Sequence, residues 1–286
     1  NNMKILISLI FTAFIALNAN AESISEKISD LIDNFFPGEG VTDVSIQVHE
    51  EDNPDFEILT NRSLDLTDES NRFIQMSLHT QETNNTDRLI TNLGYGYREL
   101  SEDKFFMYGA NGFIDIESEG HLRASLGLEA KGKILDLNAN FYEALSGGET
   151  VDGVNEEVLS GYQLNLTTQI PYMPWSTLNV QNYYFENIKA TNNTEGNKIS
   201  LEMNLTPTLQ FDISQDFSDT EGVDDETDFK LTFKHPPLND NPSLQDGFVS
   251  KVAFEKENME KKLTEKVRRD NNLTVEIQGA VLLVKK

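Results

Sequence analysis

Strict alternation of apolar and polar residues is the feature that most restricts the fold of this chain. The pattern is clearest in residues 121–131, where it reads Leu122-Arg123-Ala124-Ser125-Leu126-Gly127-Leu128-Glu129-Ala130-Lys131. Successive side chains of a β-strand point to opposite faces of its sheet, so such a strand has one apolar face and one polar face. The alternation therefore predicts an all-β fold.

The same alternation recurs along most of the chain. It predicts twelve strands, at about 42–49, 56–66, 72–81, 87–99, 104–116, 121–131, 133–144, 158–169, 177–185, 197–206, 208–217 and 226–234. Turn-forming sequences such as Glu117-Ser118-Glu119-Gly120 separate them. Short connections alternate loosely with long acidic ones.

Two architectures produce this pattern. A soluble sandwich or lipocalin-like barrel turns the apolar face inward, whereas a transmembrane barrel turns it toward lipid and encloses a polar lumen. Periodicity alone does not separate them. Strands of about 9–11 residues, an even strand number and polar faces that carry Arg, Glu, Asp and Gln favour the membrane barrel.

The N-terminus has the organisation of a secretory signal peptide. Lys4 precedes an apolar run from Ile5 to Leu17, and Ala19-Asn20-Ala21 then forms a small-x-small cleavage site. An uncleaved N-terminal anchor is the alternative, although the run is short for a transmembrane helix. We therefore expect a signal peptide at 1–21, a periplasmic N-terminal helix at 22–40, a transmembrane β-barrel at 41–235, and a C-terminal helix and linker at 236–286.

The order of residues is more specific than their alternation, and it resembles the intimin/invasin family of inverse autotransporters. Each match is short, but the matches follow one another in the order of the family across about residues 40–277. They are Met107-Tyr108-Gly109-Ala110-Asn111-Gly112-Phe113-Ile114-Asp115, His121-Leu122-Arg123, Pro171-Tyr172-Met173-Pro174, Tyr183-Tyr184, Asn204-Leu205-Thr206-Pro207 and Val267-Arg268-Arg269-Asp270-Asn271-Asn272-Leu273-Thr274-Val275-Glu276.

The resemblance implies a twelve-stranded antiparallel outer-membrane barrel that anchors and exports a C-terminal passenger. In the family, the chain after the last strand turns back and passes through the lumen to the cell surface. The resemblance also implies outer-membrane lipid, the barrel-assembly machinery and periplasmic chaperones as partners. Gly148 stands where the family usually has an aromatic residue, and no passenger or host-receptor-binding domain is visible before Lys286. We expect a monomer.

The C-terminal tail differs in charge from the rest of the chain. Residues 251–286 carry nine basic and six acidic side chains, whereas the preceding 250 residues carry 14 and 42. A basic tail would suit a lumen lined by Arg123, Glu129, Glu202, Asp212 and Asp216. Val249 to Val267 has the spacing of a helix, and Asn271 to Val284 has an extended character. A solvated periplasmic helix with a frayed end is the alternative to a tail that threads the pore through Arg268, Arg269, Asp270, Asn271 and Asn272.

Composition excludes several classes of function. The net charge of −25 excludes nucleic-acid binding driven by electrostatics, and the absence of cysteine excludes disulfides and thiolate metal sites. The four histidines lie on different elements without ligand spacing, and we find no catalytic motif. We expect no enzyme activity, cofactor or metal. The expected function is a translocator and anchor of type V secretion and adhesin export in the bacterial outer membrane. A free-standing porin-like channel for small solutes, plugged by its own tail, is the alternative.

Overall fold

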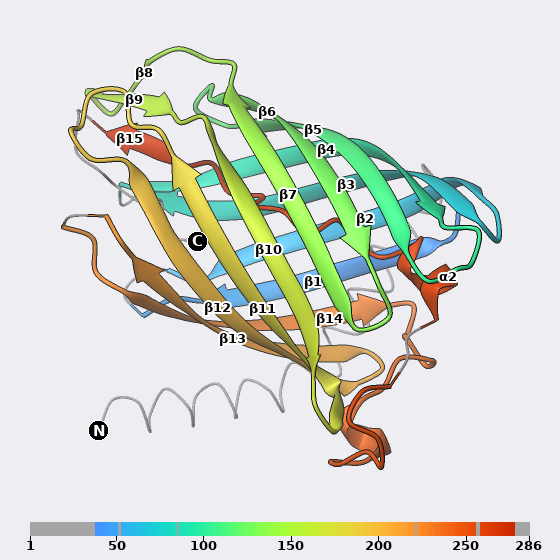
Figure 1. The fold of residues 1–286 in the computed structure, drawn as a ribbon. Helices are drawn as coiled ribbons and strands as arrows, with labels where there is room; N and C mark the ends of the chain where they lie inside the picture. The colour runs from blue at the N-terminus through green and yellow to red at the C-terminus, as the bar shows by residue number, and fades with distance from the viewer. Residues whose placement is uncertain (1–37, 51–52, 85, 221, 256–257, 278–286) are drawn as a thin grey trace, which may run out of the picture.

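Twelve antiparallel strands close into a barrel, which confirms the predicted fold class (Figure 1). The computed structural model describes residues 38–50, 53–84, 86–220, 222–255 and 258–277. The barrel strands are β1 (Gly40–Val48), β2 (Asp55–Leu66), β3 (Ser70–Thr83), β4 (Thr86–Leu100), β5 (Met107–Glu117), β6 (Leu122–Lys131), β7 (Leu135–Ala144), β10 (Gly161–Ile170), β11 (Met173–Phe185), β12 (Thr194–Thr206), β13 (Leu209–Ser218) and β14 (Glu226–His235).

Pairing of the first strand with the last closes the barrel. β1 and β14 run antiparallel, with Thr42 opposite His235 and Val48 opposite Phe229. Every other barrel strand pairs with its two neighbours in the sheet order, so this wall has no free edge among the described residues. Closure of this kind satisfies the backbone hydrogen bonds that an open sheet edge would leave exposed.

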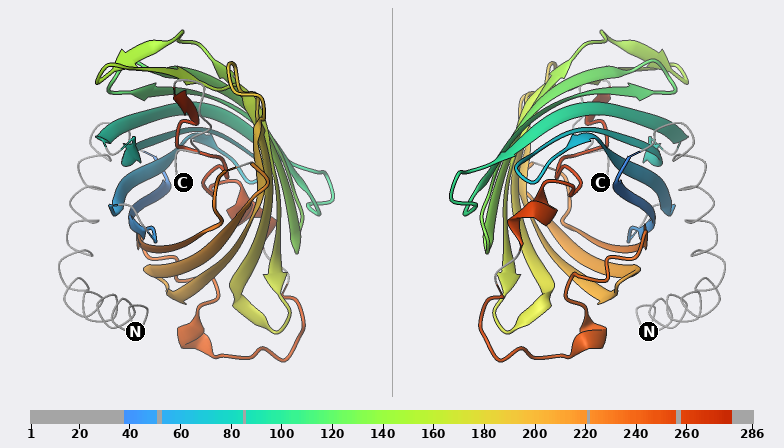
Figure 2. Two further views of the ribbon diagram at one scale, coloured as in Figure 1. Left: turned by 90° about the vertical axis from the view of Figure 1, so that its left-hand side faces the viewer. Right: turned by 90° about the vertical axis from the view of Figure 1, so that its right-hand side faces the viewer.

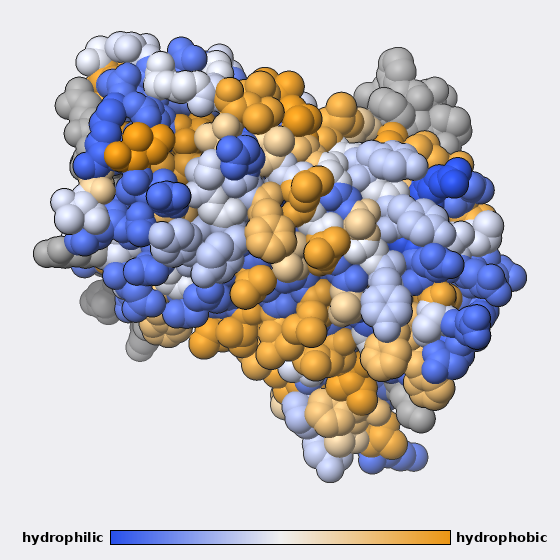
Figure 3. Space-filling model, turned by 45° about the horizontal axis from the view of Figure 1, so that its top comes forward, coloured by the Kyte–Doolittle hydropathy of each residue, from blue (hydrophilic) through white to orange (hydrophobic). Residues whose placement is uncertain are grey.

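Apolar side chains cover the outside of the barrel, which identifies it as the membrane type. Leu126 is 70% exposed, whereas Arg123 on the other face of β6 is 0% exposed. A band of hydrophobic side chains crosses the middle of the surface in Figure 3, and hydrophilic side chains lie on either side of it. A soluble barrel would have the reverse arrangement, so the soluble alternative is wrong.

The two ends of the barrel differ. At the end where β14 finishes, the connections between strands have two to six residues, as in the two between β10 and β11. At the opposite end they range from two residues between β3 and β4 to 16 between β7 and β10. The connection between β7 and β10 contains β8 (Glu149–Val151) and β9 (Val154–Val158). These two strands form a small separate sheet with β15 (Val275–Ile277), in the order β15-β9-β8. Transmembrane barrels have short periplasmic turns and longer outer loops, so this sheet marks the outer end.

The predicted helix over Val249 to Val267 is wrong. Beyond β14, the helices described are the single turn η1 (Leu244–Asp246) and the four-residue α2 (Met259–Lys262). Several other described residues of this range use backbone groups for bonds to the barrel. For example, Ser250 N donates to Tyr172 O, and Thr264 O accepts from Asn61. The contacts of this segment with the barrel have overridden its local helical spacing.

Two other predictions fall on parts of the chain that the structure does not describe. The signal peptide at 1–21 lies outside the described residues, as does nearly all of the N-terminal helix expected at 22–40. The extended character predicted for Asn271 to Val284 can be followed as far as Ile277, where β15 ends. No helix in the described ranges has the length and apolar character needed to cross a bilayer.

Candidate functional site: the barrel interior and the segment that crosses it

The C-terminal segment runs through the inside of the barrel. After β14 the chain passes η1, reaches α2 at the end with the short turns, and then continues to β15 at the opposite end (Figure 1). Both views in Figure 2 show this red segment within the ring of strands. We refer to residues 258–277 as the inner segment. Its contacts define the candidate site, because they occupy the space through which a solute or a polypeptide would have to pass.

A buried arginine holds the inner segment near α2. Arg98 on β4 donates to Leu263 O over 3.1 Å and also to Glu265 O. Its other nitrogens form two bonds with the carboxylate of Glu129, at 2.7 and 3.0 Å, and its guanidinium lies 4.3 Å from the centre of the Phe73 ring. Arg98 is 0% exposed, so protein atoms surround its guanidinium and exclude solvent from it.

Amides on the barrel wall bond to the backbone of the inner segment as a neighbouring strand would. Gln81 on β3 accepts from Leu273 N and donates to Leu273 O, both over 3.0 Å. Gln75, also on β3, accepts from Val267 N over 2.7 Å, and Asn140 on β7 donates to Arg268 O over 3.0 Å. An extended segment without a partner strand would otherwise leave these groups unpaired, at a cost of about 1–3 kcal/mol each.

Ion pairs connect the inner segment to strands around the barrel. Four of its basic side chains contact carboxylates on four different strands. The pairs are Lys262 with Asp136 on β7 at 2.7 Å, Lys266 with Asp43 on β1 at 2.9 Å, Arg268 with Glu202 on β12, and Arg269 with Asp115 on β5 at 2.7 Å. This set of contacts gives a structural reason for the excess of basic residues in the tail.

Two arginines inside the barrel share one carboxylate. Asp115 accepts from Arg123 on β6 over 2.8 Å and from Arg269 of the inner segment over 2.7 Å. Both guanidiniums also lie over aromatic rings, with Arg123 at 4.3 Å from Tyr142 and Arg269 at 4.3 Å from Phe113. Arg123 donates further to Asp270 O over 2.9 Å. Shared hydrogen bonds and cation–π contacts hold the middle of the inner segment at this depth.

The last residues of the inner segment bond to connections between strands at the outer end of the barrel. β15 pairs with β9, with Val275 opposite Val158, and Leu159 N donates to Thr274 O over 3.0 Å. The carboxylate of Glu276 accepts from three successive backbone N–H groups in the connection between β11 and β12, at 2.5 to 3.0 Å. These belong to Ile188, Lys189 and Ala190. Two connections that are far apart in sequence therefore hold the end of the inner segment.

A cluster of charged side chains around Glu156 attaches β9 to the barrel wall. Glu156 accepts from Arg88 on β4 over 2.6 and 2.8 Å, and its Oε2 lies 3.2 Å from His121 Nε2. Burial raises the pKa of Glu156, but the hydrogen bonds from Arg88 and His121 outweigh it and hold that pKa below its usual value. Glu156 is therefore ionised at neutral pH and fixes the position of the strand that receives β15.

The inner segment does not fill the lumen completely. A polar cavity of about 210 Å³ remains beside it, and the barrel wall around this cavity belongs to β1 to β3, β10 to β12 and β14. Lys198, Lys230, Asn165 and Asn179 line this cavity together with residues 268–272. The interior of the barrel is therefore polar, and the inner segment narrows it to this cavity.

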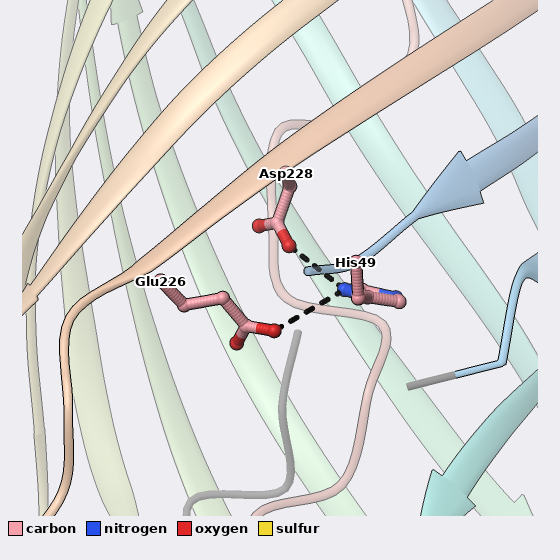
Figure 4. A group of neighbouring side chains, drawn as sticks. All are labelled: His49, Glu226 and Asp228. Carbon is pink, nitrogen blue, oxygen red and sulfur yellow. Dashed lines mark hydrogen bonds and ion pairs between the residues drawn. The ribbon is translucent and has the colours of Figure 1, made fainter. Parts of the chain in front are cut away.

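Histidine and carboxylates form a second cluster at the outer end of the barrel seam. His49, one residue beyond β1, lies with its Nδ1 2.7 Å from Asp228 of β14 and its Nε2 3.0 Å from Asp55 of β2. Glu226 Oε1 lies 3.8 Å from His49 Nδ1, the nitrogen that also meets Asp228 (Figure 4). The ligand atoms of His49, Glu226 and Asp228 lie within 4.8 Å of one another, a spacing that a metal ion could use. However, the other oxygen of Asp228 contacts Lys198 at 2.5 Å, so cationic side chains already meet this carboxylate.

The protonation of His49 should make the stability of the barrel depend on pH. Burial lowers the pKa of His49, but the hydrogen bonds to Asp228 and Asp55 outweigh it and raise that pKa to about 9 from a usual 6.5. A raised pKa stabilises the folded state fully below pH 6.5, and this contribution is lost as the pH rises toward 9. We expect a loss of about 2–3 kcal/mol across this window.

Urea unfolding in lipid vesicles at pH 6 and pH 10 measures this effect. His49→Asn should remove most of the pH dependence, whereas the control His235→Asn, at the other end of β14, should retain it. An unchanged pH dependence in His49→Asn would show that His49 does not carry the effect.

Of the five residues predicted to line the lumen, three contact the inner segment directly or through a partner, and two bond to other residues of the barrel wall. Glu202 contacts Arg268, Arg123 contacts Asp270 O, and Glu129 contacts the inner segment through Arg98. Asp212 instead accepts from Gln210 over 2.7 Å, and Asp216 accepts from the Tyr183 hydroxyl over 2.9 Å. Of the expected threading residues, Asn271 donates to Glu57 over 2.8 Å, and Asn272 N donates to the Asp270 carboxylate over 3.2 Å.

Sequence reasoning missed several contacts of the inner segment. The acidic partners Asp43, Asp115 and Asp136 are each on the polar face of a predicted strand, so alternation makes them candidates but does not distinguish them from other polar residues. Arg98, Gln75 and Gln81 are also on polar faces. Their pairing with residues more than 160 positions away depends on the depth of the inner segment, which no local pattern encodes.

A comparison with known proteins identifies relatives of this barrel. A family model described as the inverse autotransporter β-domain matches residues 12–271. An attaching and effacing protein homolog of Escherichia coli K12 is 28% identical over 145 residues, which are 47% of this chain and 48% of that protein. The uncharacterized protein YchO of the same strain is 28% identical over 136 residues, which are 45% of this chain and 28% of that protein. The chain thus spans about half the length of the first relative and less of the second.

A solved structure shows the same fold. A chain from a study of the in-meso crystallization of membrane proteins superposes with a TM-score of 0.65 and is 16% identical in sequence. The match covers 83% of this chain and 99% of that chain. At this identity the similarity supports the fold alone.

Proposed function

Because this chain belongs to the inverse autotransporter β-domain family, we propose that its barrel anchors a polypeptide in the outer membrane and exports it through the lumen. The inner segment carries the proposal. It enters at the end with the short turns, contacts the barrel along its length, and ends in β15, which pairs with β9 at the outer end. A segment held in this way fits the end state of export, in which the chain that follows would lie at the cell surface.

Export to the outer membrane requires two earlier steps. The N-terminal sequence that ends at Ala21 fits a signal peptide that directs the chain across the inner membrane. Periplasmic chaperones and the barrel-assembly machinery would then fold the barrel into the outer membrane. These partners are needed because the strands must pair into a closed barrel before they meet lipid. Unpaired strands expose backbone groups that lipid cannot satisfy.

A porin-like channel is the second candidate. The polar cavity of about 210 Å³ beside residues 268–272 is the observation that favours it. In this case the inner segment would be a plug, and its outer end would have no exported continuation. The two candidates differ in whether small solutes pass through the barrel while the inner segment is in place, which single-channel recording can test.

Surface display of a C-terminal epitope tests the proposed export. A tag placed after Lys286 should bind antibody on intact cells, because the inner segment would deliver it to the outside. A matched tag inserted in the connection between β6 and β7, at residues 132–134, should bind only after the outer membrane is permeabilised. Detection of both tags only after permeabilisation, in protein with normal heat-modifiable migration, would refute export.

A further inference from the structure

The chain that joins β14 to the inner segment carries an exposed apolar patch. Phe248, Val249, Val252 and Phe254 are 59, 66, 52 and 38% exposed. These four side chains lie within seven residues that form neither a strand nor a helix. Scattered apolar side chains on a surface need no explanation, but a compact group of this kind at one place marks a contact surface.

Hydrogen bonds hold this segment against the turn between β10 and β11. Ser250 N donates to Tyr172 O over 2.8 Å, and Tyr172 N donates to Ala253 O over 2.7 Å. Trp175 at the start of β11 donates to Phe248 O over 3.0 Å, and the two rings lie 5.5 Å apart. The exposure of the apolar side chains is therefore a property of an ordered segment and not of a frayed one.

The patch continues the lipid-facing surface of the barrel. Leu164 and Leu166 of β10 are exposed on its outer face, and Thr168 and Ile170 continue this row to the end of the strand. Tyr172, in the two-residue turn that follows, is 50% exposed. The segment that bonds to both backbone groups of Tyr172 thus begins where this lipid-facing row ends. Figures 1 and 2 show it beside the β10–β11 turn, below the ends of the strands.

The charges of the segment also fit a bilayer surface. Lys251 is exposed and lies between Val249 and Val252, where its ammonium group can reach lipid phosphates while its stem covers apolar surface. The carboxylate of the acidic neighbour Glu255 is instead occupied within the segment, because it accepts from Ser250 Oγ over 2.8 Å. Exposed apolar and basic side chains thus occur together in this segment, as in segments that lie in the membrane interface.

We propose that residues 248–254 form a membrane-contacting segment, whose apolar side chains insert into the periplasmic leaflet of the outer membrane beside the β10–β11 turn. The occupant is phospholipid, because the segment bonds to Tyr172, in the turn that directly follows the lipid-facing row of β10. The segment precedes the inner segment directly, so its attachment to the leaflet fixes the point from which the chain turns into the barrel.

A polarity-sensitive thiol label tests this contact, because the chain contains no native cysteine. Val249→Cys is labelled with bimane in the full-length protein, reconstituted in phosphatidylethanolamine and phosphatidylglycerol vesicles. Brominated acyl chains quench a label that touches lipid, and iodide quenches a label in water. Leu126→Cys on the outer face of β6 is the lipid standard, and Glu119→Cys in the β5–β6 connection is the water standard. Heat-modifiable migration verifies folding of each variant.

Bromolipid quenching at residue 249 within twofold of that at residue 126, with iodide quenching several-fold below that at residue 119, would support the proposal. Quenching by iodide alone would overturn it by placing the segment in water. Protection from both quenchers would also overturn it, because protein would then cover the patch. Val252→Cys provides a second position with the same expected result.

Discussion

Replacing Arg98 with methionine is expected to lower the free energy of unfolding of the barrel by about 3–5 kcal/mol. The reason is that Arg98 and Glu129 are both buried, and the guanidinium is the group that forms two hydrogen bonds with this carboxylate. Removing Arg98 leaves Glu129 without that partner inside the barrel. It also removes the donors to Leu263 O and Glu265 O, and so loosens the inner segment.

Urea unfolding of the variant in lipid vesicles measures this loss. Arg72→Met is the matched control, because Arg72 and Asp65 form an exposed pair at 3.6 Å that should contribute less than about 1 kcal/mol. The double variant Arg98→Met/Glu129→Met should recover part of the loss, since it leaves no lone buried charge. Equal losses in Arg98→Met and Arg72→Met would contradict the assigned role of Arg98.

Truncation before Arg268 is expected to raise the single-channel conductance of the barrel several-fold. Barrels of eight strands are filled by their own side chains, whereas those of 16–18 strands enclose an aqueous channel. A twelve-stranded barrel lies between these limits, and here the inner segment occupies much of the interior. Without residues 268–286, Asp115 and Glu202 also lose Arg269 and Arg268 as partners. The opened channel should therefore prefer cations.

Planar-bilayer recording compares this truncation with one after Ile277, which keeps the inner segment and should retain the low conductance. Arg269→Gln keeps the segment but removes one charge beside Asp115, so it should change ion selectivity more than conductance. If the truncation before Arg268 leaves the conductance unchanged, the inner segment does not obstruct the barrel in the membrane.

The barrel wall could be predicted from the sequence, because its signal is local. Each residue of β6 from Leu122 to Lys131 alternates between lipid and lumen, and this alternation needs no knowledge of other strands. The period of two does not by itself distinguish lipid from a soluble core on the apolar side. The exposure of Leu126 and the burial of Arg123 settle that question in the structure.

The contacts of the inner segment could be predicted only in part. The excess of basic residues after Lys251 indicates an acidic environment but not which carboxylates meet which cations. Asp43 and Lys266 lie 223 positions apart, and their pairing depends on the depth to which the segment enters the barrel. The helix expected over Val249 to Val267 is wrong for the same reason, because Asn61, Arg98 and Tyr172 bond to its backbone.

Cross-linking inside the barrel tests most directly whether the inner segment crosses the lumen. Val267 N bonds to the side chain of Gln75 over 2.7 Å, and the chain has no native cysteine, so Gln75→Cys/Val267→Cys introduces one defined pair. In outer membranes, a short bifunctional thiol reagent should cross-link this pair efficiently. The control pair Leu126→Cys/Val267→Cys, which has one thiol on the lipid face, should remain unlinked. Absence of the 75–267 cross-link, with residue 267 freely labelled from the periplasm, would contradict a tail that passes through the barrel.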